Sequence, residues 1–171
     1  MSKPDLNLIP PVFTTSYRVI YGDTDAAGVV YNANYLRLFE IGRTEMMRAW
    51  ALPYRAMEDL GCILPVTETW LRFKAPARYD ELLDIAVSLA DFSRLTCRFH
   101  YRITRQEPDG ASTLLTLGFT AHACVGKGGA LRPFPEEIRQ AVAAIVARQP
   151  QEPGLPRSVQ AGGIADQNRA R

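Results

Sequence analysis

This chain of 171 residues contains few histidines and cysteines, and it has no large excess of either charge. Its 20 Lys and Arg residues are matched by 18 Asp and Glu residues, so the formal net charge is only +2. Nucleic-acid-binding proteins usually carry a strong basic field, and we therefore expect no nucleic-acid partner. Cys62, Cys97 and Cys124 form no C-x-x-C pair, which argues against the common zinc and thioredoxin-like motifs.

Long apolar segments are missing as well. No run of about 18 apolar residues occurs, so we expect no membrane span. Residues 1–11 contain prolines and lack the apolar stretch of a secretory signal. Together with an odd number of cysteines, which suits a reducing compartment, these absences predict a cytoplasmic protein.

The length and the 47% of hydrophobic residues suit one globular domain with a sizeable core. Prolines interrupt residues 1–12, which we predict to be an irregular N-terminal arm. We assign residues 13–146 to the folded domain. Residues 147–171 are rich in Pro, Gly, Gln and charged residues, and this composition predicts a flexible tail.

The first part of the domain combines a strand signal with a helix signal. Residues 13–21 are rich in β-branched and aromatic residues and predict a short strand. Residues 33–50 carry apolar side chains at spacings of three and four, which is typical of a largely buried helix. Asn32 and Asn34 are candidate N-caps of this helix. Near the other end of the domain, Pro135 begins a second amphipathic helix.

Between the two helices the apolar period changes to two. Alternation predicts strands at residues 64–75, 82–90, 95–105 and 112–125. One face of the last strand consists of Leu115, Leu117, Phe119, Ala121, Ala123 and Val125. His100 and His122 fall on the polar faces of their strands. Clean alternation favours antiparallel pairing with one face on a core. We therefore predict an α+β fold in which an antiparallel sheet of about five strands wraps around one long helix.

Residues 21–31, with the sequence YGDTDAAGVVY, lie just before the long helix and carry two acids. Asp23, Asp25 and Gly28 have the spacing that opens an EF-hand, but Ala27 and Asn34 would occupy positions that need oxygen ligands. A nucleotide P-loop would need a Gly-Lys-Ser/Thr sequence, which is absent. Asp and Gly also occur in such turns for purely structural reasons.

An acyl-transfer site is a further possibility for this segment. The start of a helix offers unpaired N–H groups and positive potential, which polarise a thioester carbonyl and stabilise its oxyanion. A neighbouring carboxylate can attack the carbonyl carbon or activate a water molecule. The segment supplies both parts within a few residues.

The residues of this segment resemble the signature of the 4-hydroxybenzoyl-CoA thioesterase family, including its Tol–Pal-associated acyl-CoA thioesterase branch. The similar residues are Tyr21, Asp23-Thr-Asp25, Gly28-Val-Val-Tyr31, Asn34-Tyr35, and Glu40 with Arg43 in the helix. The order of elements is also similar, over about residues 13–146. The resemblance implies a hotdog fold and hydrolysis of an acyl-CoA to a free acid and coenzyme A. It implies no metal and no cofactor beyond the coenzyme A of the substrate, and a homo-oligomer, either a dimer or a dimer of dimers.

The resemblance also implies residue roles. Asp25 would be the catalytic nucleophile or general base, and the backbone N–H of Asn32 would polarise the thioester carbonyl. Many relatives in the Tol–Pal branch carry His at the position of Asn32, and because Asn cannot take up a proton, the backbone group is the part that can act here. The implied substrate-binding residues are Tyr21, Gly28, Val30, Tyr31, Glu40 and Arg94, the last for the phosphates of coenzyme A. Weaker candidates for those phosphates are Lys74, Arg78, Lys127 and Arg132.

Two other functions remain open from the sequence. A hotdog hydratase or dehydratase would act on a thioester by proton transfer at carbon, but such sites generally need a His near the acid, and residues 21–50 contain none. A non-catalytic acyl-CoA-binding module would bind thioesters without turnover. The identity of the acyl group is also open, since aromatic, short and medium-chain groups all fit the motif.

Overall fold

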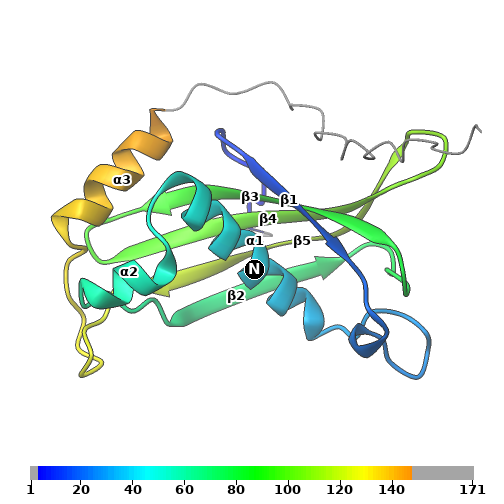
Figure 1. Ribbon diagram of the computed structural model, residues 1–171, viewed down its shortest axis with the longest axis horizontal. Helices are drawn as coiled ribbons and strands as arrows, with labels where there is room; N and C mark the ends of the chain where they lie inside the picture. Colours follow the sequence, from blue (N-terminus) through cyan, green and yellow to red (C-terminus); the bar gives the residue numbers. More distant parts are fainter. Residues whose placement is uncertain (1–3, 148–171) are drawn as a thin grey trace, which may run out of the picture.

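The computed structural model describes residues 4–147, which form one sheet and three α-helices (Figure 1). The elements in chain order are β1 (Phe13–Arg18), the 3-10 turn η1 (Tyr21–Asp23), α1 (Asn34–Trp50), α2 (Tyr54–Asp59), β2 (Val66–Phe73), β3 (Leu82–Phe92), β4 (Thr96–Gln106), β5 (Ser112–Ala123) and α3 (Glu136–Val146). All but one residue of the predicted tail, 147–171, lies outside the described residues.

The sheet has the strand order β1-β3-β4-β5-β2, and every neighbouring pair is antiparallel. It is open, with β1 and β2 at its edges. Figure 1 shows α1 lying across one face of the sheet. The predicted α+β fold, with a five-stranded antiparallel sheet around one long helix, is therefore confirmed.

Two close contacts join α1 to the sheet. The ring of Phe39 stacks on that of Tyr101 in β4, with 4.2 Å between centroids and 5° between planes. One turn later, a Cβ on Gly42 would lie 2.7 Å from methyl groups of both Ile85 and Val87 in β3. Gly42 thus lets the helix approach the sheet more closely than any other residue would allow.

The prediction for the faces of β5 was wrong. Tyr101, which faces α1, is opposite Gly118, so Phe119 points to the other face of the sheet together with His100. A bulge beside Ile103 inserts an extra residue into β5 and interrupts the alternation that the sequence suggests. The residues of β5 that share the α1 side with Gly118 are therefore polar or small.

His122 lies on this inner face and is fully buried. Its Nε2 is 2.8 Å from Thr120 Oγ1, its Nδ1 is 3.1 Å from Leu64 O, and Thr120 Oγ1 is 2.9 Å from Tyr101 Oη. Burial, and secondarily the positive charge of Arg43, lower the pKa of His122 to about 4. His122 is therefore a neutral, hydrogen-bonded member of the core and does not lie on an exposed polar face.

The N-terminal arm crosses the outer face of the sheet. Residues 4–12 form no helix or strand, yet Leu6 is only 9% exposed. Asn7 O lies 2.8 Å from His100 Nδ1, and the Ile9 N–H donates to Ser88 Oγ at 3.0 Å. The arm thereby covers two buried polar side chains of β3 and β4.

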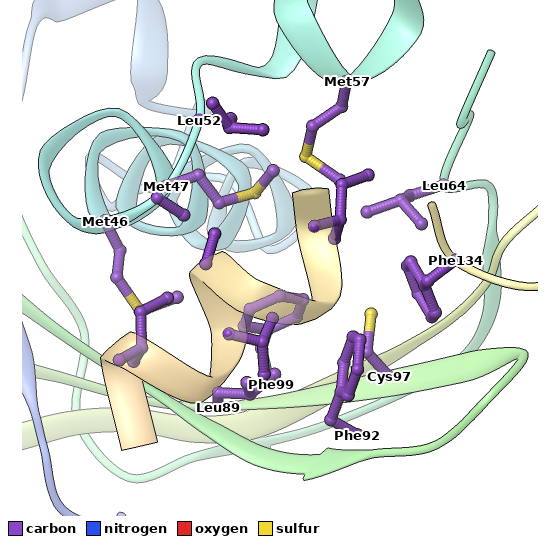
Figure 2. A pocket seen from close by; sticks show the side chains of 15 residues that line it. Met46, Met47, Leu52, Met57, Leu64, Leu89, Phe92, Cys97, Phe99 and Phe134 are labelled. Atoms are coloured by element: carbon purple, nitrogen blue, oxygen red, sulfur yellow. The ribbon is translucent and has the colours of Figure 1, made fainter. Parts of the chain in front are cut away.

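A small apolar cavity lies between α3, the second half of α1, α2 and the turn end of the β3–β4 hairpin (Figure 2). Its volume is about 40 Å³. It is lined by Met46, Met47, Ala51, Leu52, Met57, Leu64, Leu89, Phe92, Cys97, Phe99, Phe134, Ile138, Ala141, Val142 and Ile145. Within residues 4–147, the side chains by which α3 meets the domain at this cavity are all apolar.

Candidate active site

The loop between β1 and α1 holds the acidic motif in a closed turn. Thr24 and Val30 form an antiparallel bridge at its base. Inside it, the Asp25 N–H donates to Val29 O and the Gly28 N–H donates to Asp25 O, both at 2.9 Å. Gly28 has a φ of +74°, and apart from its two chain neighbours no atom of residues 4–147 lies within 4 Å of where its Cβ would be. The backbone conformation of the turn is therefore what requires glycine here.

Asp23 is the structural member of the acidic pair, because it is 4% exposed and fully engaged. Its Oδ2 accepts hydrogen bonds from the Tyr17 hydroxyl at 2.8 Å and the Ile20 N–H at 3.0 Å, and its Oδ1 is paired with Arg37. The hydrogen bond to Tyr17, and then the negative charge of Asp23, raise the pKa of Arg37. This cluster anchors the loop to β1 and α1.

The backbone of Asp23 also fixes the start of α1. Its carbonyl accepts from the Tyr31 N–H at 2.9 Å and from Asn34 Nδ2 at 2.8 Å. The predicted N-caps were wrong, since the N-cap of α1 is Ala33 and no side chain bonds to it as a cap. Asn34 uses its amide for Asp23 instead, and Asn32 Oδ1 accepts from the adjacent Ala33 N–H at 3.0 Å.

Asp25 presents its carboxylate to solvent. Its Oδ1 accepts from the Ala27 N–H at 2.8 Å, while no group within residues 4–147 hydrogen-bonds to Oδ2. The backbone N–H of Asn32 likewise has no acceptor among the described residues. One carboxylate oxygen and one amide hydrogen are thus free for a ligand at the beginning of α1.

Asp25 and Asn32 line the same open cleft, whose volume is about 380 Å³. The loop and the first turn of α1 form one wall, and the segment at the end of β2 forms the other. The full lining is Asp25, Val29, Val30, Tyr31, Asn32, Tyr35, Phe73, Lys74, Ala75 and Pro76. The arrangement sets an acid and a backbone donor against a largely apolar surface, which is the pattern of a small-molecule site.

Contacts between the two walls fix the shape of the cleft. The Tyr35 and Phe73 rings meet edge to face, with 5.3 Å between centroids. The Val30 N–H donates to Ala77 O at 2.8 Å, and the Ala77 N–H donates to the Tyr35 hydroxyl at 3.3 Å. Burial raises the pKa of Tyr35, so this hydroxyl stays protonated at neutral pH.

Of the residues predicted for the site, Asp25, Val30, Tyr31 and Asn32 come together at the cleft. Tyr21 does not line it. This residue lies in η1, beyond the end of β1, and is 80% exposed, with its ring 5.9 Å from that of Tyr79.

The other predicted residues lie away from the cleft lining. Gly28 is at the tip of the loop, and Glu40 is on the exposed side of α1. Arg94 is in the turn between β3 and β4, whereas the cleft lies beyond the other end of these strands, where Arg105 bonds to Pro76 O. At about 3.3 Å per residue, β4 separates Arg94 from the cleft of its own chain by roughly 30 Å.

Sequence reasoning missed the second wall of the cleft. Phe73, Ala75 and Pro76 have no motif of their own, and only Lys74 was a candidate, as one of several basic residues. Sequence reasoning also missed Arg37, whose side chain anchors the loop through Asp23. The spacing could have indicated this role, because Arg37 lies three residues after Asn34 and therefore on the same side of the helix.

Most of the domain matches a known family. Residues 19–142 match the model of the thioesterase-like superfamily. The chain is similar to the acyl-CoA thioester hydrolase YbgC of Escherichia coli O6:H1, with 33% identity over 114 residues, or 67% of this chain and 82% of that protein. It is 31% identical to the acyl-CoA thioesterase YbgC of Haemophilus influenzae over 132 residues, or 75% of this chain and 93% of that protein.

Solved structures give the same result. A hypothetical protein, TT1821, from Thermus thermophilus has a TM-score of 0.71 and 34% identity, covering 77% of this chain and 98% of its own. The 4-hydroxybenzoyl-CoA thioesterase of Pseudomonas sp. strain CBS-3 has a TM-score of 0.68 at 20% identity, over 76% and 98% of the two chains, and supports the fold alone. The fold is therefore the hotdog fold of the thioesterases.

The chain belongs to the thioesterase-like superfamily, and its class is that of a thioester hydrolase. The resemblance noted in the sequence is thereby confirmed. No helix within residues 4–147 is long and apolar enough to cross a membrane.

Proposed function

We propose that this protein hydrolyses an acyl-CoA to a free acid and coenzyme A at the cleft beside the start of α1. The observation that carries the proposal is that Asp25 Oδ2 and the Asn32 N–H, which have no partner among residues 4–147, lie on one cleft of about 380 Å³. A thioester bound between them would have its carbonyl oxygen on the amide and its carbonyl carbon open to attack.

The N–H of Asn32 stabilises the oxyanion as the carbonyl carbon becomes tetrahedral. A single donor of this kind is typically worth about 3–4 kcal/mol of barrier. Asp25 then acts in one of two ways. It attacks the carbonyl carbon and expels the thiolate of coenzyme A, leaving a mixed anhydride that water hydrolyses, or it takes a proton from a water molecule that attacks directly.

The chemistry of the cleft walls supports a placement for each part of the substrate. The apolar and aromatic side chains, including Tyr31, Tyr35 and Phe73, suit an acyl group of aromatic or of short or medium aliphatic type. Lys74 is the cationic residue of the lining, and it suits an anionic part of the substrate.

We propose a homo-oligomer, a dimer or a dimer of dimers, in which a second copy completes the site. The open edge strand β2, with exposed Val66 and Phe73, supports edge-to-edge pairing of two sheets. Because Arg94 lies far from the cleft of its own chain, its predicted contact with the coenzyme A phosphates requires a second copy. We propose the same for Glu40, which would contribute to substrate binding at the cleft of the second copy.

A substrate pair tests the role of Arg94. Arg94→Glu should raise KM for an acyl-CoA and leave KM unchanged for the same acyl group on N-acetylcysteamine, which has the thioester but no nucleotide. An equal rise in KM for both substrates would contradict phosphate recognition at this residue.

The structure argues against the hydratase alternative. His122 is in the core and His100 is under the N-terminal arm, so neither histidine lines the cleft with Asp25. The alternative of a binding module without catalysis predicts that thioesters bind with no release of thiol, whereas the relatives are thioester hydrolases.

The decisive experiment measures thiol release over a panel of acyl-CoAs for the wild type and Asp25→Asn. We expect the variant to lose at least about a hundredfold in kcat. Asp109→Asn is a matched control, because Asp109 Oδ1 accepts from the Ala111 N–H at 2.9 Å, two residues on as in the Asp25–Ala27 contact, and Asp109 does not line the cleft. Wild-type activity in Asp25→Asn would refute the proposal.

Label in the enzyme identifies the nucleophilic role of Asp25 when the anhydride is hydrolysed at the Asp25 carbonyl. In a single turnover in ¹⁸O-water, the anhydride route transfers an unlabelled oxygen from Asp25 to the product acid when water attacks the Asp25 carbonyl, and it labels the enzyme. The general-base route places the label in the product alone. Mass spectrometry of the tryptic peptide that contains Asp25 reads the difference.

A further inference from the structure

Two buried thiols meet at the end of the sheet that is remote from the cleft. Cys62 lies between α2 and β2, and Cys124 directly follows β5. Their Sγ atoms are 3.2 Å apart, although the residues are 62 positions apart in the chain, and both side chains are fully buried. This separation is shorter than ordinary contact between sulfur atoms and only about 1 Å longer than a disulfide bond.

The backbone around the two thiols is already fixed. Ile63 and Val125, the residues that follow them, exchange two hydrogen bonds of 2.9 Å. The Cys62 N–H donates to Met57 O at 2.9 Å, and the Cys124 N–H donates to Leu95 O at 2.8 Å. Formation of the S–S bond therefore requires only a small movement of the two side chains. The entropy of closing the loop between them has already been lost on folding, so it does not oppose the bond in the native protein.

We propose that Cys62 and Cys124 are an oxidisable pair, which a peroxide converts to an intrachain disulfide. One thiolate attacks the O–O bond of the peroxide and becomes a sulfenic acid, releasing water after proton transfer. The second thiol displaces water from the sulfenic sulfur and forms the S–S bond. Two thiols and one hydrogen peroxide thus give one disulfide and two water molecules.

Access controls the rate of this reaction. Burial raises the pKa of Cys62 to about 12, so the thiolate that must attack the peroxide is rare in the closed protein. Oxidation therefore waits for a local opening of the segment between α2 and β2. The rate should rise with peroxide at low concentration and become independent of it at high concentration, where opening limits the reaction.

Cys97 is the natural control for this pair. It is also buried, and burial raises its pKa to about 12, but its side chain lines the apolar cavity beside α3. A thiol that was merely buried would behave like Cys97. The contact with Cys124 distinguishes Cys62.

The disulfide would close a loop that contains β2, β3, β4 and all of β5. A cross-link over about 60 residues restricts the unfolded chain and should raise the unfolding midpoint by roughly 5–15 °C. The eight residues of β2 separate Cys62 from the cleft, so thioester hydrolysis should not change on oxidation. The proposal is independent of the function proposed for the cleft.

The test treats the full-length protein with hydrogen peroxide and then blocks free thiols with an alkylating reagent. We expect an intact mass lower by two hydrogen atoms, one alkylated cysteine, and a Cys62–Cys124 peptide after digestion without reductant. A reductant should reverse the mass change and the rise in midpoint. Three alkylated cysteines, or a linkage through Cys97, would overturn the proposal.

Variants make the assignment specific. Cys97→Ser should still form the disulfide, whereas Cys62→Ser and Cys124→Ala should not gain thermal stability from peroxide. If these two variants fold poorly, peptide mapping of the wild type still decides, because it needs no substitution. An oxidation rate that stays proportional to peroxide, without a plateau, would refute the gating by a local opening.

Discussion

The cavity beside α3 makes a stability prediction that can be worked out from its size. At about 24 cal/mol per Å³, a void of about 40 Å³ costs about 1 kcal/mol. Ala141 lines this void from α3, and Ala141→Val adds two carbon atoms at its wall. Burying them should contribute about 1.6 kcal/mol, and the lower helix propensity of Val should remove about 0.5 kcal/mol. We therefore expect a net gain of about 1 kcal/mol.

Ala144→Val provides the matched control on the same helix. Ala144 is exposed and does not line the cavity, so the substitution should only cost about 0.5 kcal/mol of helix propensity. The difference between the two variants, about 1.5 kcal/mol, isolates the effect of filling the void. Urea denaturation measures it directly, and thermal melting should separate the variants by about 3–6 °C.

The result could refute the packing argument in a simple way. If Ala141→Val and Ala144→Val lost stability equally, the void would not be a fixed part of the native state. α3 would then rest on the domain in several arrangements, as a helix that meets the domain through apolar side chains can. A loss in Ala141→Val alone would mean that the cavity walls cannot admit two more carbon atoms.

Three further outcomes follow from the core and the loop. Gly42→Ala should lower the free energy of unfolding by about 1–3 kcal/mol, because its Cβ would lie 2.7 Å from two methyl groups of β3; urea denaturation would show it, and an unchanged midpoint would contradict the close approach. Asp23→Asn removes the charge that pairs with Arg37. We expect the free energy of unfolding to fall by about 1–3 kcal/mol, and kcat to fall while KM changes less. Equal activity in the variant and the wild type would show that the cluster does not position the loop. The pKa of His122 is depressed in the folded state, so between pH 6.5 and pH 4 the unfolded chain binds a proton that the folded protein does not. The contribution of His122 to the free energy of unfolding is therefore complete above pH 6.5 and falls toward pH 4, by at most about 1.4 kcal/mol per pH unit. His122→Gln should flatten this part of the stability curve relative to the wild type, and an identical acid slope in the two proteins would refute the assignment.

The part of the site that could be predicted from the sequence is the part built by neighbouring residues. Asp25 and Asn32 are seven positions apart, and a turn before a helix brings such residues together by local geometry alone. The opposite wall, with Phe73 and Lys74, comes from more than 40 positions further along the chain. Only the packing of β2 against the sheet places it there, and the residues themselves carry no sign of it.

The errors also have local causes. Alternation in the sequence suggested one apolar face for β5, but a single bulge put Leu117 and Phe119 on the side away from α1. Asn32 and Asn34 were sensible caps by residue type, but the buried carbonyl of Asp23 competes for one of them. Arg94 belongs to a turn whose distance from the cleft depends on strand length and, in our proposal, on assembly.

The folded domain begins before β1, because the N-terminal arm packs on the outer face of the sheet. Residues before β1 supply the acceptor for His100 and shield the outer face of the sheet, where the guanidinium of Arg98 already lies 4.3 Å from the ring centroid of Phe119. A protein shortened to start at Phe13 would expose an aromatic surface and leave His100 without its hydrogen-bond acceptor, Asn7 O. Such a protein should be less soluble than the full chain, so the nine residues from position 4 to position 12 are as much a part of the fold as the strand that follows them.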